Sequence, residues 1–293
     1  MSAGDGYRGR GGLVGYLFAG PYLVAYGALL VYPLLAGMAL SLHKADLFGG
    51  REFVAFENYR RLVSDTVFRQ AVGNTLYFTL LTVPALTVIS LALALALNKA
   101  GRLAAFFRGV FFSSSVLSVT IVTLIWRFVL TPDGGLIANG LKAAGRAPIP
   151  FLSDPHLALP GIALTTVWWC LGLPMMLFLA GLQQIPGELY EAAALDGTSA
   201  WRTFWRITLP LIGRTLLVVV LIESVMQFQL FGQSQIMTQG GPNGASRPIV
   251  LFIYEVAFRR WDVGYAASAS EVLFALILLA SALQYAATRE RRR

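Results

Sequence analysis

Glu191-Ala192-Ala193-Ala194-Leu195-Asp196-Gly197 is the centre of a long polar stretch in a chain otherwise built from apolar runs. Pro186-Gly187-Glu188 precedes it and is typical of a helix start, with an acidic residue in the first turn. Gly197 tolerates left-handed backbone angles and therefore marks a natural helix end. Thr198 or Ser199 can cap a second helix that begins at Ala200. The stretch thus predicts two helices, joined by a sharp turn, outside the lipid bilayer.

The second of these helices carries an aromatic stripe. Its residues Trp201, Phe204, Trp205 and Thr208 recur at spacings of three and four, which places them on one helical face. Aromatic side chains gather where the membrane meets water. We therefore expect this helix to lie at the bilayer surface.

The composition is that of an integral membrane protein. The 293 residues are 56% hydrophobic and 13% charged, with a mean hydropathy of +0.65. The formal net charge of +8 suggests topology signals and contact with anionic lipid, and nothing in its distribution indicates nucleic-acid binding. Cys170 is the single cysteine, which excludes a disulfide within the chain and a cysteine-cluster metal site, and we expect it to fill the core.

Apolar runs of about 20 residues, the length that crosses a bilayer, predict an all-α membrane protein with six transmembrane helices in one domain, residues 1–293. The expected spans are residues 13–42, 72–97, 110–130, 161–182, 211–237 and 265–287. Gly172 and Pro174 should bend the fourth span. A surface helix is expected within 53–70, a loop with at most a short helix at 131–160, and a second loop at 238–262. Residues 183–210 contain the polar helix pair.

Six spans place both termini on one side of the membrane. If that side is the cytoplasm, Arg8, Arg10 and the arginines of the last five residues lie inside, as does the polar helix pair. Lysine and arginine residues are denser on this side than on the other, but their numbers on the two sides differ little. The orientation therefore depends more on the polar stretch than on charge.

Motifs along the whole chain carry a family resemblance. They are Phe53-Val54, Asn58-Tyr59-Arg60-Arg61, Asn74-Thr75, Leu124-Ile125-Trp126-Arg127, Ala180-Gly181-Leu182-Gln183, Glu188-Leu189-Tyr190, Thr238-Gln239-Gly240-Gly241-Pro242, Tyr254, Phe258 and Gly264-Tyr265-Ala266. With the 191–210 stretch, which resembles the EAA loop, the chain is similar to the permease subunits of ATP-binding-cassette (ABC) importers. It looks like the first-permease type of the branch that takes up sugars and glycerol phosphates.

Two positions depart from the family pattern. Gly213-Arg214 stands where a second proline usually follows Pro210, and Ser113-Ser114-Ser115 stands where a Leu-Pro pair is usual. Both departures make the substrate harder to assign by analogy, but neither touches the polar helix.

The resemblance implies the fold of a type I importer with a cytoplasmic coupling helix, in a bacterial or archaeal plasma membrane. It also implies four kinds of partner: a second, homologous permease, two cytoplasmic ATPases that hold ATP and Mg²⁺, an extracytoplasmic substrate-binding protein, and a sugar. The residues implied to couple to the ATPases are Glu188, Glu191, Ala192, Ala193, Asp196, Gly197, Phe204 and Pro210.

Polar side chains at membrane depth are candidates for the substrate pathway. Glu223 and Gln227 lie four residues apart on one face of the fifth span, and Trp168 or Trp169 can add an aromatic platform that suits a sugar. The alternative is that Glu223 and Gln227 form an interhelical polar pair, and that the tryptophans serve packing. For Glu271, nearer the outer end of the sixth span, a salt bridge or exposure is favoured.

The sequence predicts no catalytic or metal site. It contains no Gly-rich phosphate loop followed by Lys-Ser or Lys-Thr, so the energy must come from a partner or an ion gradient. A secondary carrier driven by an ion gradient is the alternative function, although no convincing internal repeat supports it. An intramembrane enzyme lacks a nucleophile and base.

Overall fold

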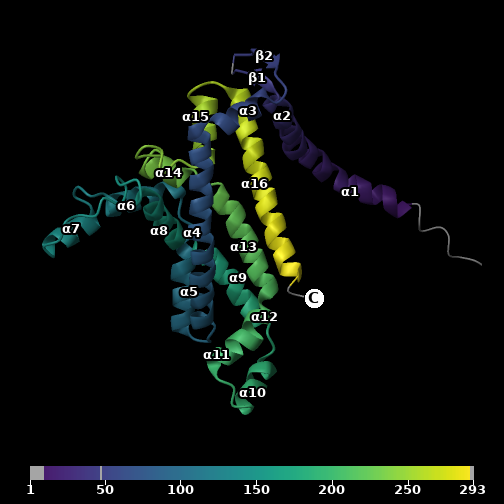
Figure 1. Cartoon of the computed structure of the whole chain (residues 1–293). Coiled ribbons are helices and arrows are strands. Elements are labelled where there is room, and N and C mark those ends of the chain that lie inside the picture. Colours follow the sequence, from purple (N-terminus) through teal and green to yellow (C-terminus); the bar gives the residue numbers. More distant parts are fainter. Residues whose placement is uncertain (1–9, 47, 291–293) are drawn as a thin grey trace, which may run out of the picture. The chain divides into compact units, whose positions relative to one another are not determined.

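The computed structural model describes residues 10–46 and 48–290, which are mostly helical (Figure 1). Residues 1–9, 47 and 291–293, which include Arg8, three of the terminal arginines and both ends of the predicted domain, lie outside the described residues. The contacts form two compact units. One contains the described residues up to Leu62 and Glu255–Glu271, and the other contains Val63–Tyr254 and the chain from Val272 onward.

The larger unit is a helical bundle. Its elements are α4 (Thr66–Leu97), α5 (Arg102–Ser114), α6 (Val119–Leu130), α7 (Leu136–Ala143), α8 (Ala158–Cys170), α9 (Gly172–Gln183), α10 (Gly187–Leu195), α11 (Ala200–Thr203), the π-helical η2 (Phe204–Thr208), α12 (Leu209–Leu211), α13 (Gly213–Phe228), α14 (Gly232–Met237), the start of α15 (Ile249–Phe258) and the end of α16 (Val263–Glu290). Helix α4 is central and packs against α8, α9 and α13.

Helix α4 begins earlier than the span predicted from hydropathy. The Asp65 carboxylate accepts hydrogen bonds from Val67 N at 2.8 Å and Phe68 N at 3.2 Å, which caps the helix at Thr66. The helix has 32 residues, and at 1.5 Å per residue it is about 48 Å long, more than the thickness of a bilayer core. The hydroxyl groups of its polar residues Thr75, Thr79 and Thr82 donate hydrogen bonds to backbone carbonyls one turn earlier in the helix.

Three bent pairs of helices occur in the larger unit, and the first helix of the third pair lies in the predicted polar segment 183–210 and not in a predicted span. The bends measure 95° between α5 and α6, 47° between α8 and α9, and 69° between the segment Ala200–Leu211 and α13. The break between α8 and α9 falls next to Gly172, where the sequence predicted a bend. Within the described residues, three helices are long and apolar enough to cross a membrane, and up to six spans result if each bent pair counts as one.

The Gly- and Pro-rich segment that follows α14 is fixed to α4 by side-chain hydrogen bonds. Asn74 Nδ2 donates to Gly244 O at 2.8 Å and to Arg247 O at 2.9 Å. Thr75 Oγ1 accepts from Ile249 N at 2.9 Å. The prediction of a loop over 238–262 was wrong for its second half, because α15 (Ile249–Phe258) forms there from an apolar run that follows Pro248.

The smaller unit combines helices with a hairpin. It contains α1 (Arg10–Tyr26), the π-helical η1 (Gly27–Val31), α2 (Tyr32–Ser41), β1 (His43–Ala45), β2 (Arg51–Phe53) and most of α3 (Glu57–Ser64), with the end of α15 and the start of α16 (Val263–Glu290). The strands are antiparallel, with His43 opposite Phe53 and Ala45 opposite Arg51.

Contacts within this unit join α3 and the hairpin to the start of α16 and to the turn before it. Arg61 forms an ion pair with Asp262 at 2.6 Å and lies 3.9 Å over the ring of Tyr265. A Cβ atom on Gly264 would collide with the carbonyl of His43, so only glycine allows this approach.

Candidate functional site

A cavity of about 350 Å³ lies inside the larger unit. Its lining residues are Ser115, Trp169, Cys170, Leu173, Glu223, Met226, Gln227, Gln229 and Gln233. These residues lie at three places in the bundle: after the end of α5, around the break between α8 and α9, and from the end of α13 to the start of α14. The cavity therefore lies where helices end or bend, and these breaks bring polar groups together within the bundle.

Glu223 and Gln227 form the polar wall of the cavity. Both belong to α13 and are buried, with 2% and 3% of their surface exposed. Gln227 Nε2 donates to Glu223 Oε2 at 3.0 Å, as the four-residue spacing permits on one helical face. This bond uses one carboxylate oxygen, and the other oxygen and the amide carbonyl have further capacity to accept hydrogen bonds.

Trp169 supplies the aromatic wall. Its Nε1 donates to Leu117 O at 3.1 Å, and its carbonyl accepts from Ser114 Oγ at 3.2 Å and Ser115 Oγ at 3.3 Å. The serine run that departs from the family pattern therefore positions this tryptophan, because its hydroxyls occupy the carbonyl that the break after α8 leaves unpaired.

Trp168 lies elsewhere. It is not among the residues that line the cavity, is 44% exposed, and pairs with Trp126 at a ring-centroid distance of 5.6 Å. Successive residues of an α-helix point about 100° apart, so the two neighbouring tryptophans cannot share one face. The structure brings Trp169, Glu223 and Gln227 together and leaves Trp168 outside this group.

Four polar or reactive residues of the cavity were missed in the sequence: Ser115, Cys170, Gln229 and Gln233. Cys170 is half-buried on the cavity wall and does not fill the core as expected, because the helix breaks directly after it. Gln233 is buried, and its Nε2 donates to Thr166 Oγ1 at 3.4 Å. A signal existed, because Gln227, Gln229, Gln233 and Gln235 form a glutamine-rich run at the end of an apolar span.

Helix α10 has the predicted boundaries and presents charge outward. It starts after Pro186, with Glu188 in its first turn, and it stops before Gly197, whose φ is +69°. Ser199 caps α11, as its side chain accepts from Arg202 N at 3.4 Å. The helix residues Glu188, Glu191 and Ala192 are exposed, as are Asp196 and Gly197 directly after it.

Two apolar residues of α10 differ in exposure. Leu195 is 90% exposed, which leaves an apolar side chain beside the carboxylates of Glu188 and Glu191. Ala193 is buried, with 6% of its surface exposed, so it packs within this chain. Leu189 of the same helix is 41% exposed, so the exposed surface of α10 combines two acidic groups with two large apolar groups.

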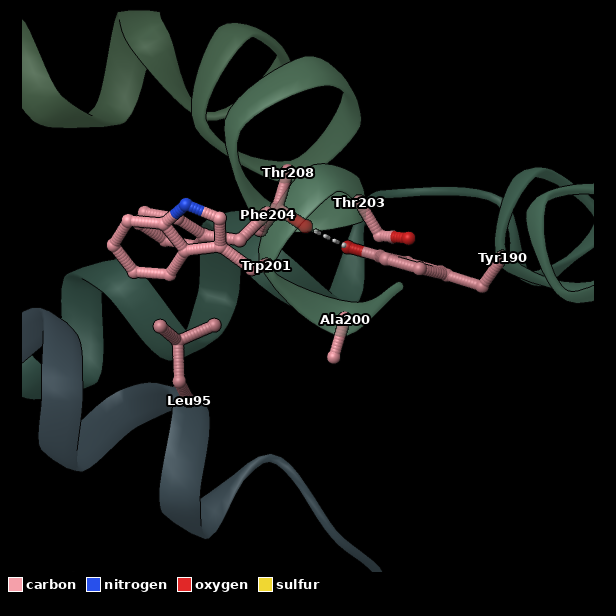
Figure 2. Close-up of a pocket in the computed structure, with 7 residues that line it drawn as sticks. All are labelled: Leu95, Tyr190, Ala200, Trp201, Thr203, Phe204 and Thr208. Carbon is pink, nitrogen blue, oxygen red and sulfur yellow. Dashed lines mark hydrogen bonds between the residues drawn. The ribbon is translucent and has the colours of Figure 1, made fainter. Parts of the chain in front are cut away.

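A hydrogen bond attaches α10 to the segment that leads into α13. Tyr190 Oη and Thr208 Oγ1 are 3.2 Å apart, and Figure 2 shows the tyrosine side chain reaching across to Thr208. A hollow of about 600 Å³ lies beside this bond, lined by Leu95, Tyr190, Ala200, Trp201, Thr203, Phe204 and Thr208.

Phe204 also packs on the bundle core formed by α4, α9 and α13, while Pro210 lies exposed in α12. Movement of α10 is thus linked to the bundle through side chains.

The comparisons with known proteins identify the family. The family described as the binding-protein-dependent transport system inner membrane component matches residues 67–293. The chain belongs to this family, and it is a multi-pass membrane subunit of a transport system. The predicted resemblance and the predicted helical importer-permease fold are therefore confirmed.

Relatives and solved structures agree with this assignment. The chain is 32% identical to the lactose transport system permease protein LacF of Rhizobium radiobacter, over 95% of each chain. It is 35% identical to the multiple sugar-binding transport system permease protein MsmF of Streptococcus mutans, over 80% of each chain. It matches a chain of a bacterial alginate ABC transporter, solved with its alginate-bound periplasmic protein, at a TM-score of 0.83 and 21% identity. That match covers 95% of this chain and 94% of the other.

Proposed function

We propose that this chain forms half of the membrane pathway of an ATP-driven importer of a sugar or oligosaccharide. The observation that carries this proposal is the polar cavity, in which a buried Glu223–Gln227 pair faces Trp169 within an otherwise apolar bundle. Sugars present hydroxyl groups and apolar ring faces, and a site of hydrogen-bonding groups beside an indole suits both. The printed names of the relatives, which include lactose and multiple-sugar systems, support the same substrate class.

The cavity can bind a sugar transiently, because its walls can change. It lies at three helix breaks, so a change in the bend between α5 and α6, or in the bend between α8 and α9, alters its walls. Glu223 and Gln227 supply acceptors for sugar hydroxyls, and Trp169 supplies a flat surface. Trp168, which was proposed as an alternative platform, has no support from the cavity geometry.

We also propose that α10 is the coupling helix that docks onto one of two cytoplasmic ATPase subunits, which hold ATP and Mg²⁺. Glu188, Glu191 and Asp196 offer charged hydrogen-bond acceptors, and Ala192 allows close approach. Gly197 permits the turn, while Phe204 and Pro210 begin the path back into the bundle. When the ATPases close, α10 moves, and the Tyr190–Thr208 bond passes that movement toward α13.

In this arrangement the ends of the chain and α10 share the cytoplasmic side. A second, homologous permease completes the pathway, and an extracytoplasmic binding protein delivers the sugar. The solved alginate transporter, crystallised with a periplasmic protein and an oligosaccharide, supports the presence of both a binding protein and a sugar partner.

Uptake by the assembled transporter tests this function. Radiolabelled lactose, maltose and arabinooligosaccharides are offered to cells that express the transporter, with either the native ATPase or an ATPase in which the phosphate-loop lysine is replaced. We expect uptake of one of these sugars to stop in the variant. Uptake that persists and follows an ion gradient would instead favour a secondary carrier.

A further inference from the structure

The hollow of about 600 Å³ beside the Tyr190–Thr208 bond is separate from the substrate cavity (Figure 2). Its lining comes from the last turn of α4, from α10 and from the segment Ala200–Thr208, and it contains no charged residue. Two of its three side-chain hydroxyl groups, those of Tyr190 and Thr208, are 3.2 Å apart and bond to each other. The rest of the lining is mainly aliphatic and aromatic, so the hollow suits an apolar group.

The hollow lies at the level where the bilayer core ends. Leu95, which lines it, belongs to the last turn of α4, and the apolar run of that helix stops at Leu97. The next residues, Asn98 and Lys99, are polar and exposed. Figure 2 shows the indole of Trp201 next to the Leu95 side chain, and Trp201 is 72% exposed. A tryptophan at the end of an apolar span is typical of the membrane–water interface, so lipid headgroups and acyl chains meet at this level.

Two arginines flank the hollow. Arg202 and Arg206 stand between lining residues of the segment Ala200–Thr208, and neighbouring residues of a helix point about 100° apart. The two arginines therefore lie beside the hollow and not within its lining. Both are exposed, and among residues 10–46 and 48–290 no carboxylate lies within 4 Å of either side-chain guanidinium.

The spacing of these arginines favours an anion between them. Like charges four residues apart share one face of a helix and repel each other. An anion that contacts both Arg202 and Arg206 removes this repulsion, and guanidinium groups bind phosphate oxygens through paired hydrogen bonds. The surface therefore combines an apolar hollow with a phosphate-binding rim at the edge of the bilayer core.

We infer that this hollow binds an anionic phospholipid, with an acyl chain against Leu95, Trp201 and Phe204 and the phosphate between Arg202 and Arg206. One such molecule carries both a long apolar chain and a net negative charge at the membrane surface. A soluble anion leaves the apolar lining uncovered, and a zwitterionic lipid brings a cation beside its phosphate. The inference needs only a membrane subunit, which the family membership shows, and is independent of the proposed sugar and ATPase roles.

The first test measures selectivity for the lipid headgroup. The protein is purified from its own membranes in detergent, with the subunits that accompany it. It is then titrated, in native mass spectrometry, with dioleoylphosphatidylglycerol or with dioleoylphosphatidylcholine, which has the same chains and no net charge. We expect one phosphatidylglycerol to bind with a Kd about tenfold lower than that of phosphatidylcholine. The double variant Arg202→Gln with Arg206→Gln should lose this difference.

The matched control removes two other cations. Lys142 and Arg146 are also exposed and four residues apart, and Figure 1 shows α7, which carries Lys142, away from α11. Lys142→Gln with Arg146→Gln should therefore keep the full selectivity for phosphatidylglycerol, although the net charge of the chain changes by the same amount.

The second test fills the hollow. Ala200 lines it and is exposed, so a tryptophan at this position occupies the hollow without entering the core. Ala200→Trp should lose the tightly bound phosphatidylglycerol, while the unfolding temperature of the lipid-free protein stays the same. Ala144→Trp, at an exposed position after α7, is the control and should keep the lipid.

The third test locates the lipid by crosslinking. A photoreactive benzoylphenylalanine replaces Trp201, which keeps an aromatic group at that position, and the protein is placed in nanodiscs with equal amounts of the two lipids. We expect adducts enriched in phosphatidylglycerol. The same probe at Leu80, which is 73% exposed in the middle of α4, should give both lipids equally.

The outcomes decide the inference without reference to transport. Equal affinity for the two lipids in the unmodified protein would overturn it, as would selectivity that survives in the arginine double variant or in Ala200→Trp. A protein adduct in place of a lipid adduct at Trp201 would show that another subunit covers the hollow, and would also overturn it. Lipid binding is measured without sugar, ATP or uptake, so a negative result leaves the proposed function intact, and a failure of ATP-driven uptake leaves this inference intact.

Discussion

At the scale of single residues, two asparagines show why an apolar chain contains polar motifs. One of them is buried and the other is half-buried. Asn58 Nδ2 donates to Ser41 O at 2.8 Å and to His43 O at 2.9 Å, which satisfies carbonyls where α2 ends and β1 begins. Asn74 does the same for Gly244 and Arg247 in the larger unit. These amides fix loops to helices, so their value is structural.

Asn58→Ala should therefore destabilise the protein. Asn58 is 6% exposed, and the substitution leaves two backbone carbonyls without their donor, which costs about 1–3 kcal/mol. Thermal unfolding in detergent measures the loss. Asn139→Ala is the matched control, because Asn139 is exposed and makes one hydrogen bond of 3.2 Å to Gly134 O. Equal unfolding temperatures for both variants would contradict the structural role of Asn58.

Gln227→Ala should impair uptake without weakening association with the ATPase subunits. The variant removes one cavity hydrogen bond and leaves Glu223 without its amide partner. A bond worth about 1–1.5 kcal/mol corresponds to a fall of about tenfold in the uptake rate at limiting sugar. Gln284→Ala is the control, since Gln284 also donates to α13, at Ser224 Oγ, but does not line the cavity. Unchanged uptake in Gln227→Ala would make the Glu223–Gln227 pair a structural one.

At the scale of elements, the break between α8 and α9 depends on one close approach. A Cβ atom on Gly172 would lie 2.6 Å from Phe111 O and 2.8 Å from Phe112 Cα, both of them backbone atoms of α5. Gly172→Ala should therefore push α5 and α9 apart and lower stability by about 1–3 kcal/mol. Gly109→Ala, in α5, meets nothing within 4 Å and serves as the control in the same unfolding measurement. A loss no larger than that of the control would contradict this packing.

The coupling role of α10 predicts that Gly197→Pro and Glu191→Lys abolish transport while the folded subunit remains in the membrane. Proline holds φ near −65°, which is incompatible with the +69° of Gly197, and lysine reverses a charge on the exposed face of α10. Uptake and membrane content are measured together. Gly187→Ala is the control, because a Cβ there meets nothing within 4 Å. Normal uptake in both variants would remove α10 from the coupling mechanism.

Some elements could be predicted from the sequence because local chemistry determines them. Gly197 and Ser199 fix the ends of α10 and α11, and Gly172 marks the break between α8 and α9. Others could not be predicted. The 95° bend between α5 and α6 contains serines but no glycine or proline. Helix α15 was hidden by the Gly- and Pro-rich residues before it.

The cavity was predictable only in part for a related reason. The spacing of Glu223 and Gln227 is a property of one helix, so the sequence shows that they share a face. The choice between Trp168 and Trp169, and the contribution of Ser115 from another helix, depend on how α5, α8 and α13 pack. The pattern of residues along the chain does not show how helices pack against one another.

At the scale of the whole molecule, the larger unit holds both the cavity and α10. In the proposed function this unit therefore links substrate passage to the ATPases. That task requires partner subunits, since the chain lacks the phosphate-loop motif that would let it hydrolyse ATP by that route.

Native mass spectrometry of the complex, purified from its own membranes in mild detergent, shows which subunits assemble with this chain. We expect one copy of this chain, one copy of a second, homologous permease and two ATPase subunits. The Glu191→Lys variant should lose the ATPases and keep the second permease. A chain that is recovered alone, or only as a homo-oligomer, would contradict the proposal that this protein is half of an ATP-driven importer.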